Sequence, residues 1–265
     1  GMADWPIDEL GGKTPLEYAR TPNMDYIASC GVLGLTQTIP EGFPPGSDVG
    51  TLSLLGYDPR QYHTGRSPIE AASMGVELGP EDIAFRCNLV TIGREADGVE
   101  TMVDFAADHI PSPEAAELIQ AVSAEFGGGE FEFHSGVSYR HLLVWHGGQE
   151  AMQTTPPHDI TGQSLHGHWP QGDGGQRLCE LMRRSREIFA EHPVNTRRQA
   201  AGCKPVSSIW LWGQGRRPAV PTIAERFGLS GVVISAVDLV RGLGVLAGLE
   251  IIEVPGATGF LDTNY

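Results

Sequence analysis

Apolar positions along the chain alternate between helical spacing and short runs typical of strands. Helix starts with a hydroxyl residue before Pro at the first helical position occur at Thr14, Thr21, Ser67 and Ser112. Two further helices are predicted over residues 177–190 and 236–247. Strands are predicted over residues 32–38, 83–91, 139–145, 207–212, 232–235 and 250–254. This alternation favours an α/β fold with a mixed or parallel sheet covered by helices.

A Pro-Gly loop precedes Ser47, which stands at the predicted start of a helix that Gly56 ends. The positive end of a helix dipole stabilises both a bound anion and an oxygen nucleophile. A hydroxyl is a weak nucleophile until a base or a metal activates it, and no His lies within the next ten residues. The residues alone therefore leave two interpretations open: a nucleophilic Ser47, or a plain helix cap made by Ser47 or Asp48.

The composition limits the classes of protein that the chain could be. Its 265 residues are 40% hydrophobic, which is too apolar for a disordered chain. The formal net charge of −15 disfavours binding to nucleic acid or to an anionic membrane. No apolar run approaches the roughly 20 residues of a membrane span, and no leader is visible. We therefore expect a cytoplasmic protein whose four scattered cysteines are free thiols.

Charge is unevenly distributed along the chain. Residues 177–226 carry ten basic and four acidic side chains, a local balance of +6. Sixteen of the 18 basic residues are Arg, whose planar guanidinium matches carboxylate or phosphate. The alternative for the helical arginines is a solvated helix face. His166 and His168, with His158, suggest a metal site only weakly, and a solvent-exposed loop is the favoured interpretation.

Several motifs occur in the order typical of one enzyme family. They are Gly12-Lys13-Thr14-Pro15-Leu16, Pro45-Gly46-Ser47-Asp48-Val49, Leu54-Leu55-Gly56-Tyr57-Asp58-Pro59, Thr64-Gly65-Arg66-Ser67-Pro68, Phe85-Arg86-Cys87-Asn88-Leu89, Tyr139-Arg140-His141 and Pro157-His158-Asp159. Together they resemble the archaeal-type, cofactor-independent phosphoglycerate mutase family of the alkaline phosphatase superfamily. Some bacterial relatives carry the label of a proposed homoserine kinase.

The resemblance implies a phosphorylated small-molecule substrate and an intramolecular phosphoryl transfer from 3-phosphoglycerate to 2-phosphoglycerate. Ser47 resembles the nucleophile, which forms a phosphoserine and also binds metal. Two divalent ions, Mn, Mg or Zn, are implied as cofactors. The resemblance and the basic cluster together give candidate substrate-binding residues, which are Arg66, Arg86, Arg140, His158, Asp159, Arg198, Lys204 and Arg216.

The resemblance also implies a domain organisation. Residues 1–75 and 251–265 correspond to a partial phosphatase-like core, and residues 76–250 to an inserted α/β substrate-binding domain. Apart from Ser47, the metal ligands of the family are expected outside this chain, which is therefore expected to be inactive alone. Two alternatives stay open: a homoserine kinase-like phosphotransferase, although no nucleotide-binding loop is visible, and a non-catalytic binding fragment. The sequence does not indicate an oligomeric state.

Overall fold

The chain divides into two units, residues 1–38 and 39–265. The computed structural model describes residues 4–43, 45–96, 98–258 and 263, so parts of the predicted core, residues 1–3, 44, 259–262, 264 and 265, lie outside the described residues. The first unit contains η1 (Asp8–Leu10), α1 (Pro15–Tyr18) and α2 (Pro22–Cys30). The helix start predicted at Thr14 is closed by a capping box, because Thr14 Oγ1 accepts from Glu17 N at 3.2 Å and Glu17 Oε2 accepts from Thr14 N at 2.8 Å.

The strand predicted over residues 32–38 is wrong, because none of these residues is in a strand. Apolar and β-branched residues favour a strand only where a neighbouring strand and a packing surface exist. Val32 and Leu35 are fully exposed here. The local pattern is typical of a strand, but the described residues of this unit provide no neighbouring strand with which these residues could pair.

The second unit contains a five-stranded sheet in which every pairing is antiparallel. Its strands are β1 (Ile83–Arg94), β2 (Glu100–Asp104), β3 (Phe131–His134), β4 (Arg140–Trp145) and β7 (Ser208–Gly215). The expectation of a mixed or parallel sheet is wrong for this sheet. Short turns join β1 to β2 and β3 to β4, and such connections can join only antiparallel neighbours. Among the strands of the described residues, β8 (Val232–Val233) and β9 (Glu250–Ile251) pair in parallel.

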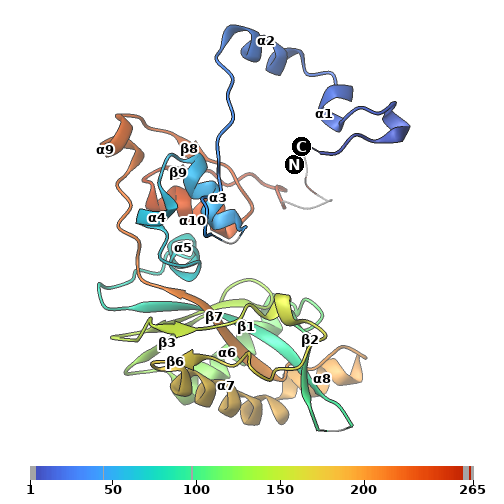
Figure 1. Cartoon of the computed structure of the whole chain (residues 1–265). Helices are drawn as coiled ribbons and strands as arrows, with labels where there is room; N and C mark the ends of the chain where they lie inside the picture. The colour runs from blue at the N-terminus through green and yellow to red at the C-terminus, as the bar shows by residue number, and fades with distance from the viewer. Residues whose placement is uncertain (1–3, 44, 97, 259–262, 264–265) are drawn as a thin grey trace. The chain divides into compact units, whose positions relative to one another are not determined.

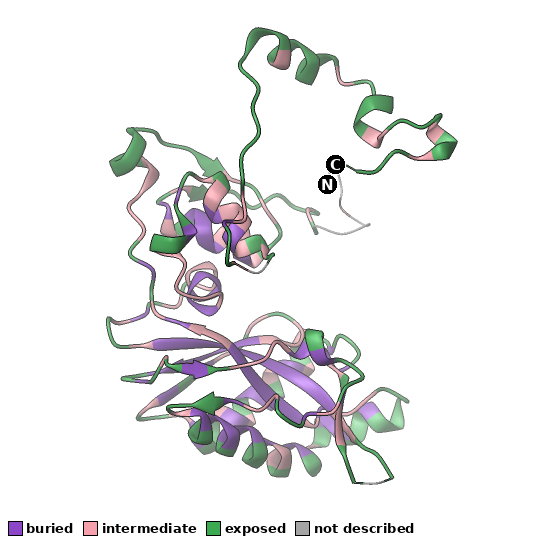
Figure 2. Ribbon diagram, viewed as in Figure 1, coloured by how far each residue is buried: buried purple, intermediate pink, exposed green. Residues whose placement is uncertain are grey.

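The two faces of the large sheet differ. Odd-numbered residues of β1 from Ile83 to Leu89 are buried in a core shared with α6 (Ser112–Phe126), α7 (Gly175–Ala190) and α8 (Pro193–Ala200). Figure 1 shows these helices along one side of the sheet, and Figure 2 shows the buried strands and the exposed outer surface of α7. Because side chains alternate along a strand, Arg86 and Asn88 of β1 lie on the opposite face. Residues 154–174 contain η2 (Pro157–Ile160) and β6 (Gln171–Gly172), which pairs with β5 (Met152–Gln153).

A second apolar cluster forms among helices that precede and follow the sheet in the sequence. Its elements are α3 (Ser47–Leu54), α4 (Pro59–Tyr62), α5 (Ser67–Ser73), α9 (Ile223–Phe227) and α10 (Asp238–Leu246). Leu52 and Ile69 pack there with Leu239 and Leu243. The cluster joins segments that precede and follow the sheet in the sequence. The helices α9 and α10 therefore share a core with α3 and α5, although the sequence prediction placed α9 and α10 in the inserted domain. The domain boundaries at 75 and 251 stay a prediction.

Two close backbone approaches require glycine. A Cβ at Gly242 of α10 would lie 1.8 Å from the Ile69 carbonyl oxygen of α5, so these two helices cross in contact. Gly65, with φ of +134°, and Gly215 face each other where the chain before α5 crosses the end of β7. A Cβ at Gly65 would lie 2.1 Å from the Gln214 carbonyl oxygen. The segment that begins α5 is therefore fixed directly against the sheet.

Candidate functional site

A cavity of about 280 Å³ lies on the sheet face that α6 and α7 leave free. It is lined by Arg66, Arg86, Asn88, Phe105, Tyr139, Arg140, His158 and Trp212. The antiparallel register places three strands side by side at this point, because Arg86 of β1 pairs with Trp212 of β7, and Asn88 of β1 pairs with Arg140 of β4. The remaining lining residues come from the start of α5, from η2 and from loops next to strands.

Positive charge predominates in this cavity. The Arg86 guanidinium is 4% exposed and donates to Oε1 of Glu70, a buried residue of α5. Arg66 Nε donates to the same oxygen at 2.9 Å. Burial lowers the pKa of Arg86 and the Glu70 charge opposes this, but an Arg side chain stays protonated at any physiological pH. Arg140 has only a distant carboxylate partner, Asp238, at 3.9 Å, so three guanidinium groups face one close carboxylate.

Two of these arginines have unused hydrogen-bond donors. Arg86 Nε and Arg140 Nε are buried and have no hydrogen-bond partner among the residues that the structure describes. A buried N–H without an acceptor is costly, and these two atoms are closed to water, so the ligand-binding capacity of the site rests on the guanidinium groups that line the cavity. Carboxylate and phosphate are the groups that guanidinium binds best.

Trp212 forms one wall of the cavity. Its ring lies 5.2 Å from the Arg86 guanidinium carbon and 5.8 Å from that of Arg66. Its indole N–H donates to Asn88 Oδ1 at 3.0 Å, and Asn88 Nδ2 donates to the Phe105 carbonyl at 3.1 Å. These bonds fix the orientation of the ring, against which the guanidinium planes can be held in position.

His158 of η2 closes another side, with its ring centroid 5.3 Å from that of Trp212. Burial lowers the pKa of His158, Asp159 partly opposes the shift, and the charges of Arg66 and Arg86 lower it further. His158 is therefore neutral at neutral pH and offers one donor and one acceptor to a ligand. Asp159 itself is exposed and is not among the lining residues.

Three of the predicted substrate-binding residues lie elsewhere and have carboxylate partners. Arg198 is buried and its Nη1 donates to Glu114 at 2.9 Å. Lys204 Nζ lies between two aspartates, and Arg216 Nε donates to Glu150 at 3.0 Å. None of the three lines the 280 Å³ cavity.

Ser47 is the first residue of α3 and is exposed, so the predicted position at a helix start is confirmed. The predicted cap is not: Gly46 is the N-cap, and among the described residues no side chain caps this helix. Asp48 Oδ2 instead lies 2.9 Å from His63 Nε2. Burial raises the pKa of Asp48, but the hydrogen bond and charge of His63, with backbone donors, more than offset this and leave the pKa below its usual value.

The described residues do not fit the two-metal centre that the resemblance implies. No group of three or more His, Cys, Asp or Glu side chains that could hold a metal occurs in the described part of the chain. The pair of Asp48 and His63 supplies two ligands beside Ser47, which is fewer than a protein site for a divalent ion normally needs. The described residues therefore provide no complete site for the two divalent metals. His166 and His168 do not form a metal-ligand group there either.

Sequence reasoning missed several residues of this site. Asn88 and Trp212 could have been found from the period of two along the strands. Asn88 lies two residues after the candidate Arg86, and Trp212 lies two residues after Trp210. Glu70 lies one helical turn after Arg66, which is a recognisable pair spacing. Tyr139 lies in the motif Tyr139-Arg140-His141 but is not among the candidate residues, and no local pattern indicates Phe105 or the partnership of His63 with Asp48.

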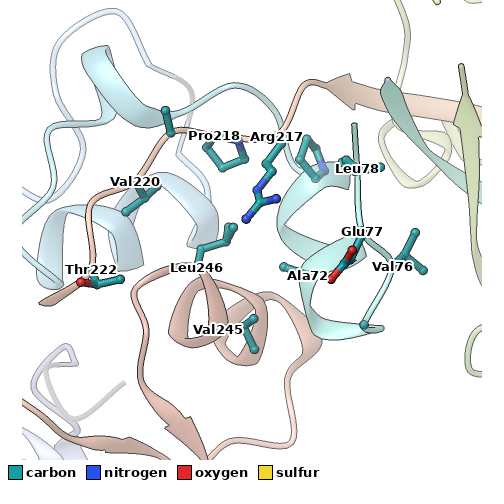
Figure 3. Close-up of a pocket in the computed structure, with 13 residues that line it drawn as sticks. Ala72, Val76, Glu77, Leu78, Arg217, Pro218, Val220, Thr222, Val245 and Leu246 are labelled. Atoms are coloured by element: carbon teal, nitrogen blue, oxygen red, sulfur yellow. The ribbon is translucent and has the colours of Figure 1, made fainter. Parts of the chain in front are cut away.

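A larger cavity, about 470 Å³, lies between α5, α10 and the segment after β7. Figure 3 shows mostly apolar side chains around it, with Val245, Leu246 and Val220 on one side and Ala72 and Val76 on another. The basic residue among them is Arg217 and the acidic one is Glu77. A cavity with one base and one acid has much weaker attraction for a polyanion than the cavity on the sheet.

No helix in the described residues is long and apolar enough to cross a membrane.

Comparison with known proteins identifies the class to which this arrangement belongs. A family model described as 2,3-bisphosphoglycerate-independent phosphoglycerate mutase matches residues 28–195. The chain is 56% identical over its full length to a probable 2,3-bisphosphoglycerate-independent phosphoglycerate mutase of Geobacter sulfurreducens, and 52% identical to a mutase of Methanothrix thermoacetophila. It covers 66% of each of these two relatives.

Solved structures give the same result. A Pyrococcus horikoshii protein matches all of this chain and 62% of its own, with a TM-score of 0.76 and 28% identity. The cofactor-independent phosphoglycerate mutase of Thermoplasma acidophilum matches 97% of this chain and 69% of its own, with a TM-score of 0.60 and 30% identity. The fold is thus that of a phosphoglycerate mutase-like α/β protein. The chain belongs to the 2,3-bisphosphoglycerate-independent phosphoglycerate mutase family, which confirms the resemblance seen in the sequence.

Proposed function

We propose that this chain supplies the substrate-binding pocket of a phosphoglycerate mutase, an isomerase that interconverts 3-phosphoglycerate and 2-phosphoglycerate. The observation that carries the proposal is the convergence of Arg66, Arg86 and Arg140 on one cavity of about 280 Å³. Phosphoglycerate has a carboxylate and a phosphate at its two ends, and both are groups that arginine binds with two parallel hydrogen bonds. The names of the relatives support the same substrate.

Within the pocket, the guanidinium groups of Arg66, Arg86 and Arg140 bind the acidic groups of the substrate. The neutral His158 imidazole accepts a hydrogen bond from, or donates one to, a substrate hydroxyl. The aromatic ring of Trp212 excludes water from one side. A pocket that holds the glycerate while its phosphoryl group is absent would limit hydrolysis of a phosphorylated enzyme.

For the chemical step we propose Ser47 as nucleophile. Its Oγ forms a bond to phosphorus as the bond from phosphorus to the substrate oxygen breaks, and the proton that Ser47 gives up ends on the released hydroxyl. Reversal of the step at the neighbouring hydroxyl gives the isomer. The position of Ser47 in the first turn of α3 supports this role, because the positive end of a helix dipole stabilises a phosphorylated side chain. A cytoplasmic, glycolytic role stays a prediction that follows from this activity.

Calorimetric titration of the protein with 3-phosphoglycerate tests the binding role. Arg140→Gln removes a guanidinium of the pocket, and Arg216→Gln is the matched control, because the two side chains are 38% and 36% exposed. We expect Arg140→Gln to weaken binding about tenfold or more, as is typical for loss of a charge-assisted hydrogen bond. Binding should also weaken with salt. Equal affinities of the two variants would overturn the assignment of the pocket.

A second candidate, binding without turnover, is favoured by the incomplete metal-ligand set of the described residues. We propose that this chain alone binds substrate and does not isomerise it. A coupled assay with manganese should show the same background rate for the chain and for its Ser47→Ala variant. A rate that depends on Ser47 would refute the second candidate and support the first. Nothing in the described residues favours a homoserine kinase.

A further inference from the structure

Three consecutive residues next to the pocket have a left-handed backbone. Ala107, Asp108 and His109 have φ values of 45°, 54° and 49°, and none is glycine. A Cβ crowds the backbone in this conformation, so single non-glycine residues adopt it uncommonly and runs of three need support from surrounding structure. We call residues 106–110 the left-handed turn; the Ile110 N–H donates to the Ala106 carbonyl at 3.2 Å across it.

Arg198 supports the turn from within the protein. Its side chain is 3% exposed, and its Nη2 donates to the Ala107 carbonyl at 2.7 Å. Its other donors are bound as well, Nε to the Lys204 carbonyl at 3.0 Å and Nη1 to Glu114 at 2.9 Å. The guanidinium thus connects the left-handed turn to α6 and to the chain after α8, and Arg198 does not line the cavity.

Lys204 supports the turn from the outer side. Its Nζ lies 2.8 Å from Asp104 Oδ2 and 2.8 Å from Asp108 Oδ1, and its backbone N–H donates to Asp108 Oδ2 at 2.7 Å. Asp104 also accepts from the N–H groups of Ala106, at 2.8 Å, and Asp108, at 3.1 Å. Lys204 therefore neutralises two carboxylates: Asp104, which binds the turn's own backbone, and Asp108, which belongs to the turn.

The turn positions two rings at the pocket. Phe105, just before the turn, lines the cavity, and its ring centroid is 6.0 Å from that of His158. The exposed His109 ring lies 5.5 Å from the ring of Tyr139 and 6.4 Å from that of Phe105. Displacement of the turn would therefore move one wall of the cavity and the imidazole beside it.

We propose that Arg198 and Lys204 are positioning residues, which hold the left-handed turn so that Phe105 and His109 stand at the substrate pocket. This inference rests on the proposed function of the pocket. It gives the two basic residues a role different from the direct substrate contact that their charge indicates in the sequence. Both act through the turn, because their cationic groups are bound to the turn and its neighbours.

Lys204→Met tests the proposal, since Lys204 is 43% exposed and Met keeps most of its aliphatic chain. Arg197→Met is the matched control: it removes a cation from the same region, whose partner Glu117 lies on α6 and not on the turn. Two quantities are measured: the NMR shift of the His109 Hε1 proton, which the Tyr139 and Phe105 rings displace, and the affinities for inorganic phosphate and 3-phosphoglycerate.

We expect Lys204→Met to move the His109 resonance toward its value in an unfolded peptide and to weaken 3-phosphoglycerate binding severalfold. Arg197→Met should change neither quantity. Adding Ala107→Gly, which relieves a strained position, should partly restore both. Rescue of this kind would not follow if Lys204 only touched the ligand.

Weaker binding in Lys204→Met with an unmoved His109 resonance would overturn the proposal, because Lys204 would then act on the ligand itself. A moved resonance with unchanged affinity would overturn it as well, because the turn would not belong to the pocket. If the unaltered protein bound neither anion, the proposed function of the pocket would fail, and the His109 resonance would still report whether Lys204 holds the turn.

Discussion

Removal of the Glu70 charge is expected to destabilise the protein far more than removal of an exposed carboxylate. Glu70 and Arg86 are both nearly excluded from water, with side chains 8% and 5% exposed. In Glu70→Gln the Arg86 guanidinium stays charged and buried without a carboxylate, and breaking such a pair costs about 3–5 kcal/mol. In the control Glu117→Gln, the lost pair with Arg197 is half exposed and contributes about 0–1 kcal/mol.

Urea unfolding followed by tryptophan fluorescence measures this difference, because Trp212 lies beside Arg86. With a slope of about 2–3 kcal/mol/M, the midpoint of Glu70→Gln should fall by about 1–2 M, and that of Glu117→Gln by a few tenths. The double variant Glu70→Gln, Arg86→Met removes both charges and should be more stable than Glu70→Gln alone. Equal midpoints for Glu70→Gln and Glu117→Gln would refute the argument that Arg86 depends on its buried partner.

Three further outcomes are expected. Gly242→Ala places a methyl group against the facing helix and should lower the free energy of unfolding by about 1–3 kcal/mol. Gly50→Ala within α3 should leave the free energy of unfolding equal or raise it by up to about 1 kcal/mol, and the urea midpoints of the two variants decide this. Burial and then the Arg86 charge lower the pKa of His141 from 6.5 to about 3, so the unfolded chain takes up this proton first as pH falls. Between pH 7 and pH 4 the free energy of unfolding of the unaltered protein should therefore fall by roughly 2–3 kcal/mol more than that of His141→Asn, as measured by urea titrations. A thiol reagent should label the exposed Cys30 and Cys203 in the folded protein and all four cysteines in denaturant; four labels in the folded state would contradict the burial of the other two.

Local signals in the sequence predicted the helices well. The helix start predicted at Ser112 was placed to within one residue, because α6 begins at Ser112 itself with Pro111 as its N-cap and no side-chain cap. The amphipathic pattern over 177–190 lies within α7, which spans Gly175–Ala190. Capping and helical spacing are properties of neighbours in sequence, so they can be recognised without the fold. Strand pairing joins distant residues, which is why the direction of the sheet was predicted wrongly.

The candidate site was predicted in part for the same reason. Arg66, Arg86, Arg140 and His158 do line one cavity, and the family motifs had indicated all four. Arg198 and Lys204 entered the prediction through the local excess of positive charge. That count could not include the carboxylates that bind them, because Glu114 and Asp104 lie 84 and 100 residues away in sequence. Charge balance in a stretch of sequence therefore does not measure free charge in a folded protein.

The crossing of Gly65 and Gly215 limits how one side of the cavity on the sheet can move. The contact joins backbone to backbone, and it is supported by the hydrogen bond from Thr64 Oγ1 to the Arg216 carbonyl at 2.6 Å. Arg66 follows this crossing directly, so the side of the cavity formed by α5 and β7 cannot swing open without separating two main chains. Amide exchange should be slow there and faster around η2, which carries His158 on the opposite side. The side of the cavity formed by α5 and β7 is therefore a fixed surface, on which Arg66 and Trp212 keep their places relative to each other.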